Sequence, residues 1–356
     1  MKRKSILITS GVIMLTLIAI TIGGFWYMSV QPLYKPGMVR AGKNLNAPLL
    51  PPTQPDGNGK WLVEPGIELA HFAVGKGRNV LVIHGGPGMP FIQPMSGLEP
   101  LTDQFRFHYY DQRGSGESTR PIDRFTSPNM YQNMQELDKT LGLGAQIADI
   151  ERIRKILGDE KLILIGHSWG GLLASLYAAE FPEHVEALIL VSPANILVMP
   201  QPRGEDDLFA SVRAGLPPSQ QTEFDAFMKE YMNFNTLFQK SENDLVAMNI
   251  QFGEYYQQVV HGSMQVPGKP GGWMVWAMYI SMGQQHDYRP VLTGVHVPVL
   301  VIHGRNDLQN EAATRLYADT FPNARLVTLD NAAHFSFEDQ PAQFADIVGT
   351  FLENHK

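Results

Sequence analysis

The stretch from Lys161 to Pro182, KLILIGHSWGGLLASLYAAEFP, most constrains what this chain can fold into. It opens with an apolar run, 162–165, which predicts a strand buried on both faces. It closes with an Ala- and Leu-rich run, 172–181, which predicts a helix that ends before Pro182. Between them lies G-H-S-W-G, so the chain must turn sharply around Ser168. Such a turn projects the serine hydroxyl above the sheet, and the helix N-terminus behind it favours negative charge. Ser168 is therefore a candidate nucleophile.

Strands and helices alternate along most of the chain. This alternation predicts a mostly parallel sheet with helices on both faces and a site at the carboxyl ends of the strands. The expected strands span 61–63, 67–74, 79–83, 105–110, 162–165, 185–191, 299–302 and 325–329, and the expected helices span 143–157, 172–181, 311–321 and 341–353.

One long segment breaks this alternation. Residues 195–290 contain polar, Met-rich and aromatic-rich helical stretches without buried strand runs. We therefore expect a helical cap over 195–290, inserted into a core made of 60–194 and 291–356. Within the cap, tryptophans and methionines at helical spacing predict a packed interior or, alternatively, the lining of an apolar pocket; they are Trp273, Met274, Trp276, Met278 and Met282.

Two further residues complete a candidate catalytic triad. A serine hydroxyl is a poor nucleophile until a base takes its proton, and the base needs an acid that orients it. Asp307 and His334 each follow an expected strand, and the order serine, acid, histidine is that of α/β-hydrolases. Asp330 is a rival acid, but it lies too close in sequence to His334 to approach the ring from behind. We predict the triad Ser168, Asp307 and His334.

The candidate nucleophile also needs an oxyanion hole, in which two backbone donors are fixed in advance. One donor is expected to be the N–H group of Trp169, directly after the serine. The other should come from the glycine-rich loop 84–88, where the backbone can approach a substrate closely. Gly86 is the preferred donor in this loop, and Gly85 is the alternative.

Three motifs carry a resemblance to a known family: H-G-G-P-G at 84–88, D-Q-R-G-S-G-E-S at 111–118 and G-H-S-W-G-G at 166–171. Together they resemble the proline iminopeptidase family of α/β-hydrolases, which are serine peptidases that remove an N-terminal residue, often proline. The resemblance covers the core and implies an α/β-hydrolase fold with a cap. It also implies the same triad and the oxyanion donors Gly86 and Trp169.

The cap departs from the pattern of that family. There, acidic cap residues bind the free amine of the substrate, and one of them belongs to a Trp-Glu pair. Here neither Trp273 nor Trp276 is followed by glutamate, and Glu254, beside Tyr255 and Tyr256, is a candidate replacement. We expect a serine aminopeptidase that acts on short peptides through an acyl-enzyme, with a carboxylesterase or lactonase acting on small esters as the alternative. The complete triad argues against a third possibility, a binding module without activity.

The first thirty residues combine a basic start with a long uncharged run. Three basic residues follow Met1, and residues 5–30 carry no charge and are rich in Ile, Leu and Val. About 20 apolar residues suffice to cross a bilayer as a helix. We expect residues 1–30 to form an uncleaved membrane anchor, with a cleaved signal peptide as the alternative. The protein would then be single-pass, with its catalytic domain outside the cytoplasm. The Pro-rich residues 31–59 would form a stalk or a segment that wraps the body.

Composition excludes several other classes of function. The chain has no cysteine, so it has no disulfide, no thiolate metal site and no cysteine nucleophile. Its net charge of −7 gives no electrostatic case for nucleic acid. No group of histidine and acidic residues has the spacing of a metal site, so we expect neither metal nor cofactor. The remaining histidines beside strand ends are expected to be structural, namely His84, His167 and His303.

Overall fold

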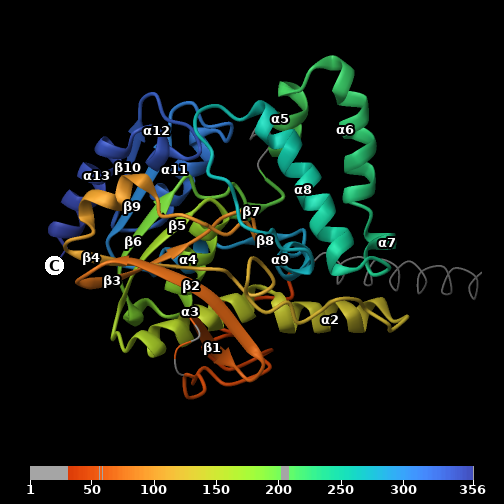
Figure 1. The fold of residues 1–356 in the computed structure, drawn as a ribbon, viewed down its shortest axis with the longest axis horizontal. Coiled ribbons are helices and arrows are strands. Elements are labelled where there is room, and N and C mark those ends of the chain that lie inside the picture. The colour runs from red at the N-terminus through yellow and green to blue at the C-terminus, as the bar shows by residue number, and fades with distance from the viewer. Residues whose placement is uncertain (1–30, 56, 58, 202–207, 356) are drawn as a thin grey trace, which may run out of the picture.

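One eight-stranded sheet runs through the molecule (Figure 1). The structure is a computed structural model that describes residues 31–55, 57, 59–201 and 208–355. The strand order is β1-β2-β4-β3-β5-β6-β9-β10; β1 and β2 pair antiparallel, as do β2 and β4, and all other neighbours are parallel. The strands are β1 (Lys60–Glu64), β2 (Ile67–Gly75), β3 (Arg78–Ile83), β4 (Phe105–Tyr110), β5 (Leu162–His167), β6 (Val185–Val191), β9 (Val299–Gly304) and β10 (Ala324–Leu329).

Helices cover both faces of this sheet. One face packs against α3 (Leu143–Leu157), α4 (Trp169–Glu180) and α11 (Glu311–Thr320). The other packs against η1 (Ser96–Leu101), α12 (Ser336–Asp339) and α13 (Pro341–Glu353). Successive strand residues enter opposite clusters: Leu164 faces the first group of helices, and Ile163 and Ile165 face the second. A strand covered on both sides has to be apolar throughout, which explains the run at 162–165. The mostly parallel sheet with helices on both faces is confirmed.

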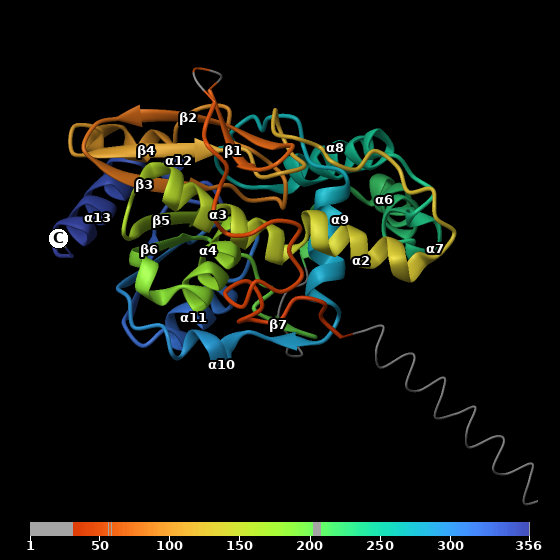
Figure 2. The same cartoon turned by 90° about the horizontal axis from the view of Figure 1, so that it is seen from below.

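The segment between β6 and β9 is largely helical. Its helices α5 (Leu208–Gly215), α6 (Pro218–Tyr231) and α8 (Glu242–Val259) stand to one side of the sheet (Figure 1). Every residue of α9 except Tyr279 is buried, and Figure 2 shows this helix beside α2, against which it packs. The tryptophans and methionines of α9 are therefore packed interior. The division of 195–290 from the core as a cap domain remains a proposal.

The other elements are α2 (Met130–Leu141), η2 (Pro182–His184), β7 (Val198–Met199), α7 (Phe234–Leu237), α9 (Trp273–Met282), β8 (His286–Asp287) and α10 (Arg289–Leu292).

The arginine of the 111–118 motif belongs to a closed group of buried charges. Arg113 donates to both carboxylate oxygens of Asp149, at 2.6 Å from Nε to Oδ2 and 2.5 Å from Nη2 to Oδ1. Glu64 accepts from Arg113 at 3.1 Å and from Arg152 at 3.0 Å, and Arg152 also reaches Asp149 at 3.0 Å. All four residues are buried. Two positive and two negative charges neutralise one another, as burial of charge requires.

The segment 31–55 packs along the body. Tyr34 is buried, and its hydroxyl donates to the carboxylate of Glu180 at 2.9 Å. The same carboxylate, which is 1% exposed, accepts from the N–H groups of Gly37 at 2.7 Å and Arg40 at 3.0 Å. Further along, Arg152 donates to the carbonyls of residues 47 and 48. These contacts are those of a wrapping segment.

The expected membrane location needs correction. In the ranges that the structure describes, no helix is long and apolar enough to cross a membrane. The expected anchor, residues 1–30, lies outside those ranges. Its support is the sequence pattern alone, a basic start followed by an uncharged apolar run. The prediction of a single-pass protein with its catalytic domain outside the cytoplasm is therefore withdrawn, and so is the membrane as a partner.

The wrapping segment predicts a loss of stability when it is removed. A variant lacking residues 1–59 loses the hydrogen bonds from Tyr34, Gly37 and Arg40 to Glu180 and the buried side chains of Tyr34 and Val39, and each large apolar side chain buried contributes about 1.5–3 kcal/mol. Its unfolding temperature, measured by calorimetry, should be at least about 5 °C lower than that of a variant lacking residues 1–30 only. Equal unfolding temperatures would show that the segment adds nothing to the fold.

Candidate active site

Ser168 is the one half-buried residue in a buried strand-turn-helix unit. From 162 to 178, every residue except Ser168 is buried. Its φ of 54° and ψ of −121° are strained for a residue with a side chain, and such strain costs about 1–3 kcal/mol. Hydrogen bonds hold the strained backbone: its N–H donates to Val191 at 2.9 Å, and its carbonyl accepts from Gly171 at 2.9 Å and Ala194 at 3.0 Å. These bonds fix the backbone of Ser168 in a conformation that a residue with a side chain rarely adopts.

The glycines around Ser168 allow backbones to approach too closely for a side chain. A Cβ on Gly166 would lie 2.3 Å from the carbonyl oxygen of Gly170, and one on Gly170 would lie 2.2 Å from that of Ile83. A Cβ on Gly85 would lie 2.8 Å from the Cβ of Ser168. The G-x-S-x-G turn and the glycine-rich loop after β3 are thus in direct contact.

Asp307 and His334 form a buried pair beside this turn. The Nδ1 atom of His334 lies 2.9 Å from Oδ2 and 3.2 Å from Oδ1 of Asp307. The Asp307 side chain is 1% exposed and that of His334 is 11% exposed. His167, the residue before Ser168, donates from Nε2 to the carbonyl of His334 at 3.0 Å. The three predicted triad residues thus lie at the carboxyl ends of parallel strands, on adjoining loops.

The loops that carry the pair are bonded to each other. The N–H of Asn306 donates to the carbonyl of Ala332 at 2.8 Å. A Cβ on Gly304 would lie 2.1 Å from the carbonyl oxygen of Ala333, so the loops touch there as well. The rival acid Asp330 points outward, since its side chain is 70% exposed and pairs with Arg305.

The charge of Asp307 is stabilised although the residue is buried. Burial alone would raise the pKa of this carboxyl group, but attraction to His334 and hydrogen bonds from His334 and from the N–H of Gln309 outweigh it. The pKa of Asp307 is therefore held below its ordinary value. An ionised carboxylate at this position keeps the proton of the imidazole on Nδ1 and leaves Nε2 free to accept one.

The two predicted oxyanion donors flank the serine. The N–H of Trp169 is the first of α4, so it has no carbonyl of its own helix to bond. Gly86 has a φ of +115°, and its loop reaches Ser168 through Gly85. Their roles as donors, and that of Ser168 as nucleophile, remain proposals.

The structure adds Tyr256, a residue whose role the sequence does not reveal. The ring of Tyr256, on α8, stands edge-to-face to the ring of His334, with centroids 6.4 Å apart. A small apolar cluster of the 195–290 segment includes Phe224, Tyr255 and Val259. Leu308, directly after Asp307, packs against this cluster, as Tyr256 does. The 195–290 segment therefore contacts His334 and the residue next to Asp307. The adjacent tyrosines 255 and 256 are visible in the sequence, but which of them faces the site depends on how α8 is placed.

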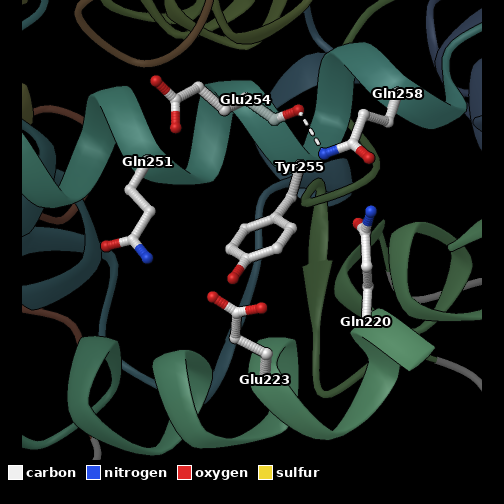
Figure 3. Close-up of a pocket in the computed structure, with 6 residues that line it drawn as sticks. All are labelled: Gln220, Glu223, Gln251, Glu254, Tyr255 and Gln258. Carbon is white, nitrogen blue, oxygen red and sulfur yellow. Dashed lines mark hydrogen bonds between the residues drawn. The ribbon is translucent and has the colours of Figure 1, made fainter.

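Glu254 lies away from the Asp307–His334 pair. It is exposed, and it lines a groove between α6 and α8 together with Glu223 and Tyr255. Figure 3 shows Tyr255 pointing from α8 toward Glu223 on α6. Residues 254 and 256 are two positions apart on a helix and so face different directions. The candidate replacement for the amine-binding acid is therefore not in the site.

Glu242 is the buried acid of α8, and it already has partners. Its carboxylate pairs with Arg120 and accepts the N–H groups of Gly272 at 3.1 Å and Trp273 at 2.7 Å. These contacts fix the start of α9. Three more cap acids, residues 205–207, lie outside the described chain.

The histidines expected to be structural sit in hydrogen-bonded positions. His84 donates from Nδ1 to the carbonyl of Gly85 at 3.0 Å, and its Nε2 accepts from the N–H of Gln112 at 3.1 Å. His303 lies 3.1 Å from the hydroxyl of Thr314. Within the described ranges, no group of three histidine or acidic side chains could hold a metal ion.

Comparison with known proteins supports the expected fold. A family model described as "alpha/beta hydrolase fold" matches residues 78–341. A proline iminopeptidase from Heyndrickxia coagulans is 25% identical over 292 residues, which cover 79% of this chain and 92% of that protein. The resemblance inferred from the motifs and the expected α/β-hydrolase fold are both confirmed.

Solved structures with low sequence identity share the fold. A proline iminopeptidase from Mycobacterium smegmatis gives a TM-score of 0.54 at 20% identity, covering 86% of this chain and 98% of that one. An esterase from Thermogutta terrifontis gives 0.53 at 22% identity, covering 82% and 95%. Both likenesses concern the fold alone.

The buried histidines predict a loss of stability in mild acid. Burial lowers the pKa of His84 to about 4 and that of His167 to about 3, against 6.5 for a free side chain. Below pH 6.5 the unfolded chain gains protons that the folded chain does not, so stability falls as the pH decreases toward 4. Between pH 7 and 5, His84 alone should account for about 2 kcal/mol. Urea unfolding at both pH values should show a smaller difference for His84→Gln than for the unaltered protein. Equal differences would contradict the assignment.

Proposed function

Because this chain belongs to the α/β-hydrolase fold family, we propose that it is a serine hydrolase that works through a covalent acyl-enzyme. The observation that carries the proposal is the buried Asp307–His334 pair, set beside a strained and half-buried serine. The strained backbone of the serine costs stability, and together with the acid–histidine pair it matches the needs of nucleophilic catalysis.

The proposed first step is acylation. His334 takes the proton of the Ser168 hydroxyl on Nε2 while the oxygen attacks the substrate carbonyl. The oxyanion that forms is met by the N–H groups of Gly86 and Trp169, aided by the N-terminus of α4. His334 then gives its proton to the leaving amine or alcohol, and the acyl group stays on Ser168. Throughout, Asp307 holds the imidazole by its Nδ1–H and stabilises its positive charge.

The second step releases the acyl group. A water molecule enters where the leaving group departed, and His334 takes its proton as the water attacks the ester carbon. The second tetrahedral intermediate uses the same two backbone donors. Its collapse frees a carboxylic acid and returns the proton to Ser168. This cycle needs no metal and no cofactor.

For the substrate, we propose short peptides with a free N-terminus, from which the enzyme releases the first residue. The proposal rests on the proline iminopeptidase named among the relatives and on the motifs at 84–88 and 111–118. A substrate ammonium group has to meet a carboxylate when it leaves water, since an unpaired buried charge is costly.

A small-ester hydrolase is the second candidate, and a specific observation favours it. Two described acids of the 195–290 segment are already engaged or turned away: Glu242 is occupied by Arg120 and two N–H groups, and Glu254 faces an outer groove. Neither is placed to receive an ammonium group beside the Asp307–His334 pair. An ester or lactone has no such charge, so this arrangement suits it.

The triad predicts a large loss of turnover when either reacting residue is removed. Ser168→Ala or His334→Ala should each lower kcat by about 10³-fold or more, and the double variant should lose little beyond either one. A phosphonate that acts on active serines should label the unaltered protein at Ser168. The exposed Ser219→Ala serves as the matched control and should keep full activity. Near-normal turnover by Ser168→Ala would end the hydrolase proposal.

A paired assay separates the peptidase from the esterase. The substrates are a proline anilide with a free N-terminus, its N-acetyl twin and a short-chain aryl ester. An aminopeptidase should lose at least about 10²-fold in kcat/KM on acetylation, because the carboxylate that meets the ammonium is then left unpaired. Equal cleavage of both anilides, or turnover of the ester alone, would replace the peptidase with the esterase.

A further inference from the structure

We propose that Asp339 is a positioning residue. It links the loop that carries His334 to residues 260–265, the returning segment, which follows α8. The inference rests on the proposed serine hydrolase chemistry, because it assigns His334 the part of the base. Asp339 lies at the end of α12, five residues after His334. It forms no bond to the imidazole, so it acts through the backbone that carries the ring.

The two carboxylate oxygens of Asp339 hold two different segments. Oδ2 accepts the N–H of Ala333, the residue before His334, at 2.8 Å. Oδ1 accepts the N–H of Ser263, which follows α8, at 2.6 Å. A carboxylate is suited to this task, since both of its oxygens accept and neither donates.

The segment after α8 fits closely against this carboxylate. Gly262 has a φ of +76°, and a Cβ at this position would lie 2.5 Å from Oδ2 of Asp339 and 3.0 Å from the Cβ of Ala333. The positive φ and the close approach both require glycine here. The backbone at Gly262 is therefore in direct contact with the Asp339 side chain, which accepts a hydrogen bond from the loop that carries His334.

The neighbouring acid makes a parallel connection. Oε1 of Glu338 accepts from the Gln265 side chain at 2.5 Å and from the N–H of Ser96 at 3.2 Å. Ser96 begins η1, which follows the glycine-rich loop. The single-turn helix α12 thus joins the returning segment to the loops on both sides of the site.

The contact of Tyr256 with His334 extends this connection from the loop backbone to the ring of the proposed base. From Tyr256 to Gln265, one continuous stretch touches the ring of His334, then Asp339 and then Glu338. The position of this stretch and the position of the base are therefore coupled by contact and by hydrogen bonds. A displacement of about 1 Å at a catalytic group costs on the order of 10²-fold in rate.

The test compares Asp339→Asn with a control of the same charge change. Asparagine keeps the shape but has one accepting oxygen, and its NH2 group would face an N–H donor, so one of the two segments is released. The control is Asp330→Asn, which removes a charge from the same loop at an exposed position paired with Arg305. Both are assayed well below their measured unfolding temperatures.

The expected result is slower chemistry with little change in binding. Asp339→Asn should react with the active-serine phosphonate at least about 10-fold more slowly than the unaltered protein, with kcat reduced and KM within about twofold. The low-field NMR signal of the proton between His334 and Asp307 should shift or broaden. Asp330→Asn should match the unaltered protein in all three measurements. A folded Asp339→Asn that also matches it would overturn the inference.

A second variant covers the case in which Asp339→Asn does not fold. Gly262→Ala keeps the carboxylate but places a Cβ 2.5 Å from it, and it should slow phosphonate labelling in the same way. Labelling at the unaltered rate by a folded Gly262→Ala would contradict the connection. If the unaltered protein is not labelled at all, the proposed hydrolase function fails, which separates that outcome from failure of this inference.

Discussion

The close approach of three backbone segments around Ser168 is the constraint on which the rest of the structure depends. The loop after β3, the turn after β5 and the residues after β6 all meet there without room for a side chain on Gly85, Gly166 or Gly170. These strands must therefore end at one level, which a parallel sheet provides. The two helical layers follow, since a sheet of apolar strands has to be covered on both faces. The loops bearing Asp307 and His334 then have little freedom.

Features encoded by neighbouring residues could be predicted from the sequence. The expected strand 162–165 lies within β5, and the expected helix 143–157 coincides with α3. The choice of Asp307 over Asp330 also needed only chain spacing, because a carboxylate four residues before His334 cannot easily turn back to its ring. The observed bond between His334 and Asp307 agrees with that reasoning.

Features that join distant parts of the chain could not be predicted. The contact of Tyr256 with His334 depends on the direction from which α8 crosses the site, and hydrophobic spacing does not specify it. Asp339 accepts from Ser263, which precedes it by 76 positions, and from Ala333, which precedes it by six. It therefore connects a distant segment to a nearby loop. The membrane location was wrong for a related reason, because it rested on the composition of one segment. The wrapping of 31–55 likewise appears only once the partners of Glu180 are known.

The buried group formed by Glu64, Arg113, Asp149 and Arg152 has a consequence for how the sequence can change over time. The four charges sum to zero, so loss of any one of them leaves a net charge in the buried interior. Acceptable changes must therefore occur in compensating pairs, one acid with one base. Since Arg152 also donates to the carbonyls of residues 47 and 48, a pair change that includes Arg152 would loosen the N-terminal wrap as well. These four positions should vary together among relatives, and drift there should be slower than at isolated core positions.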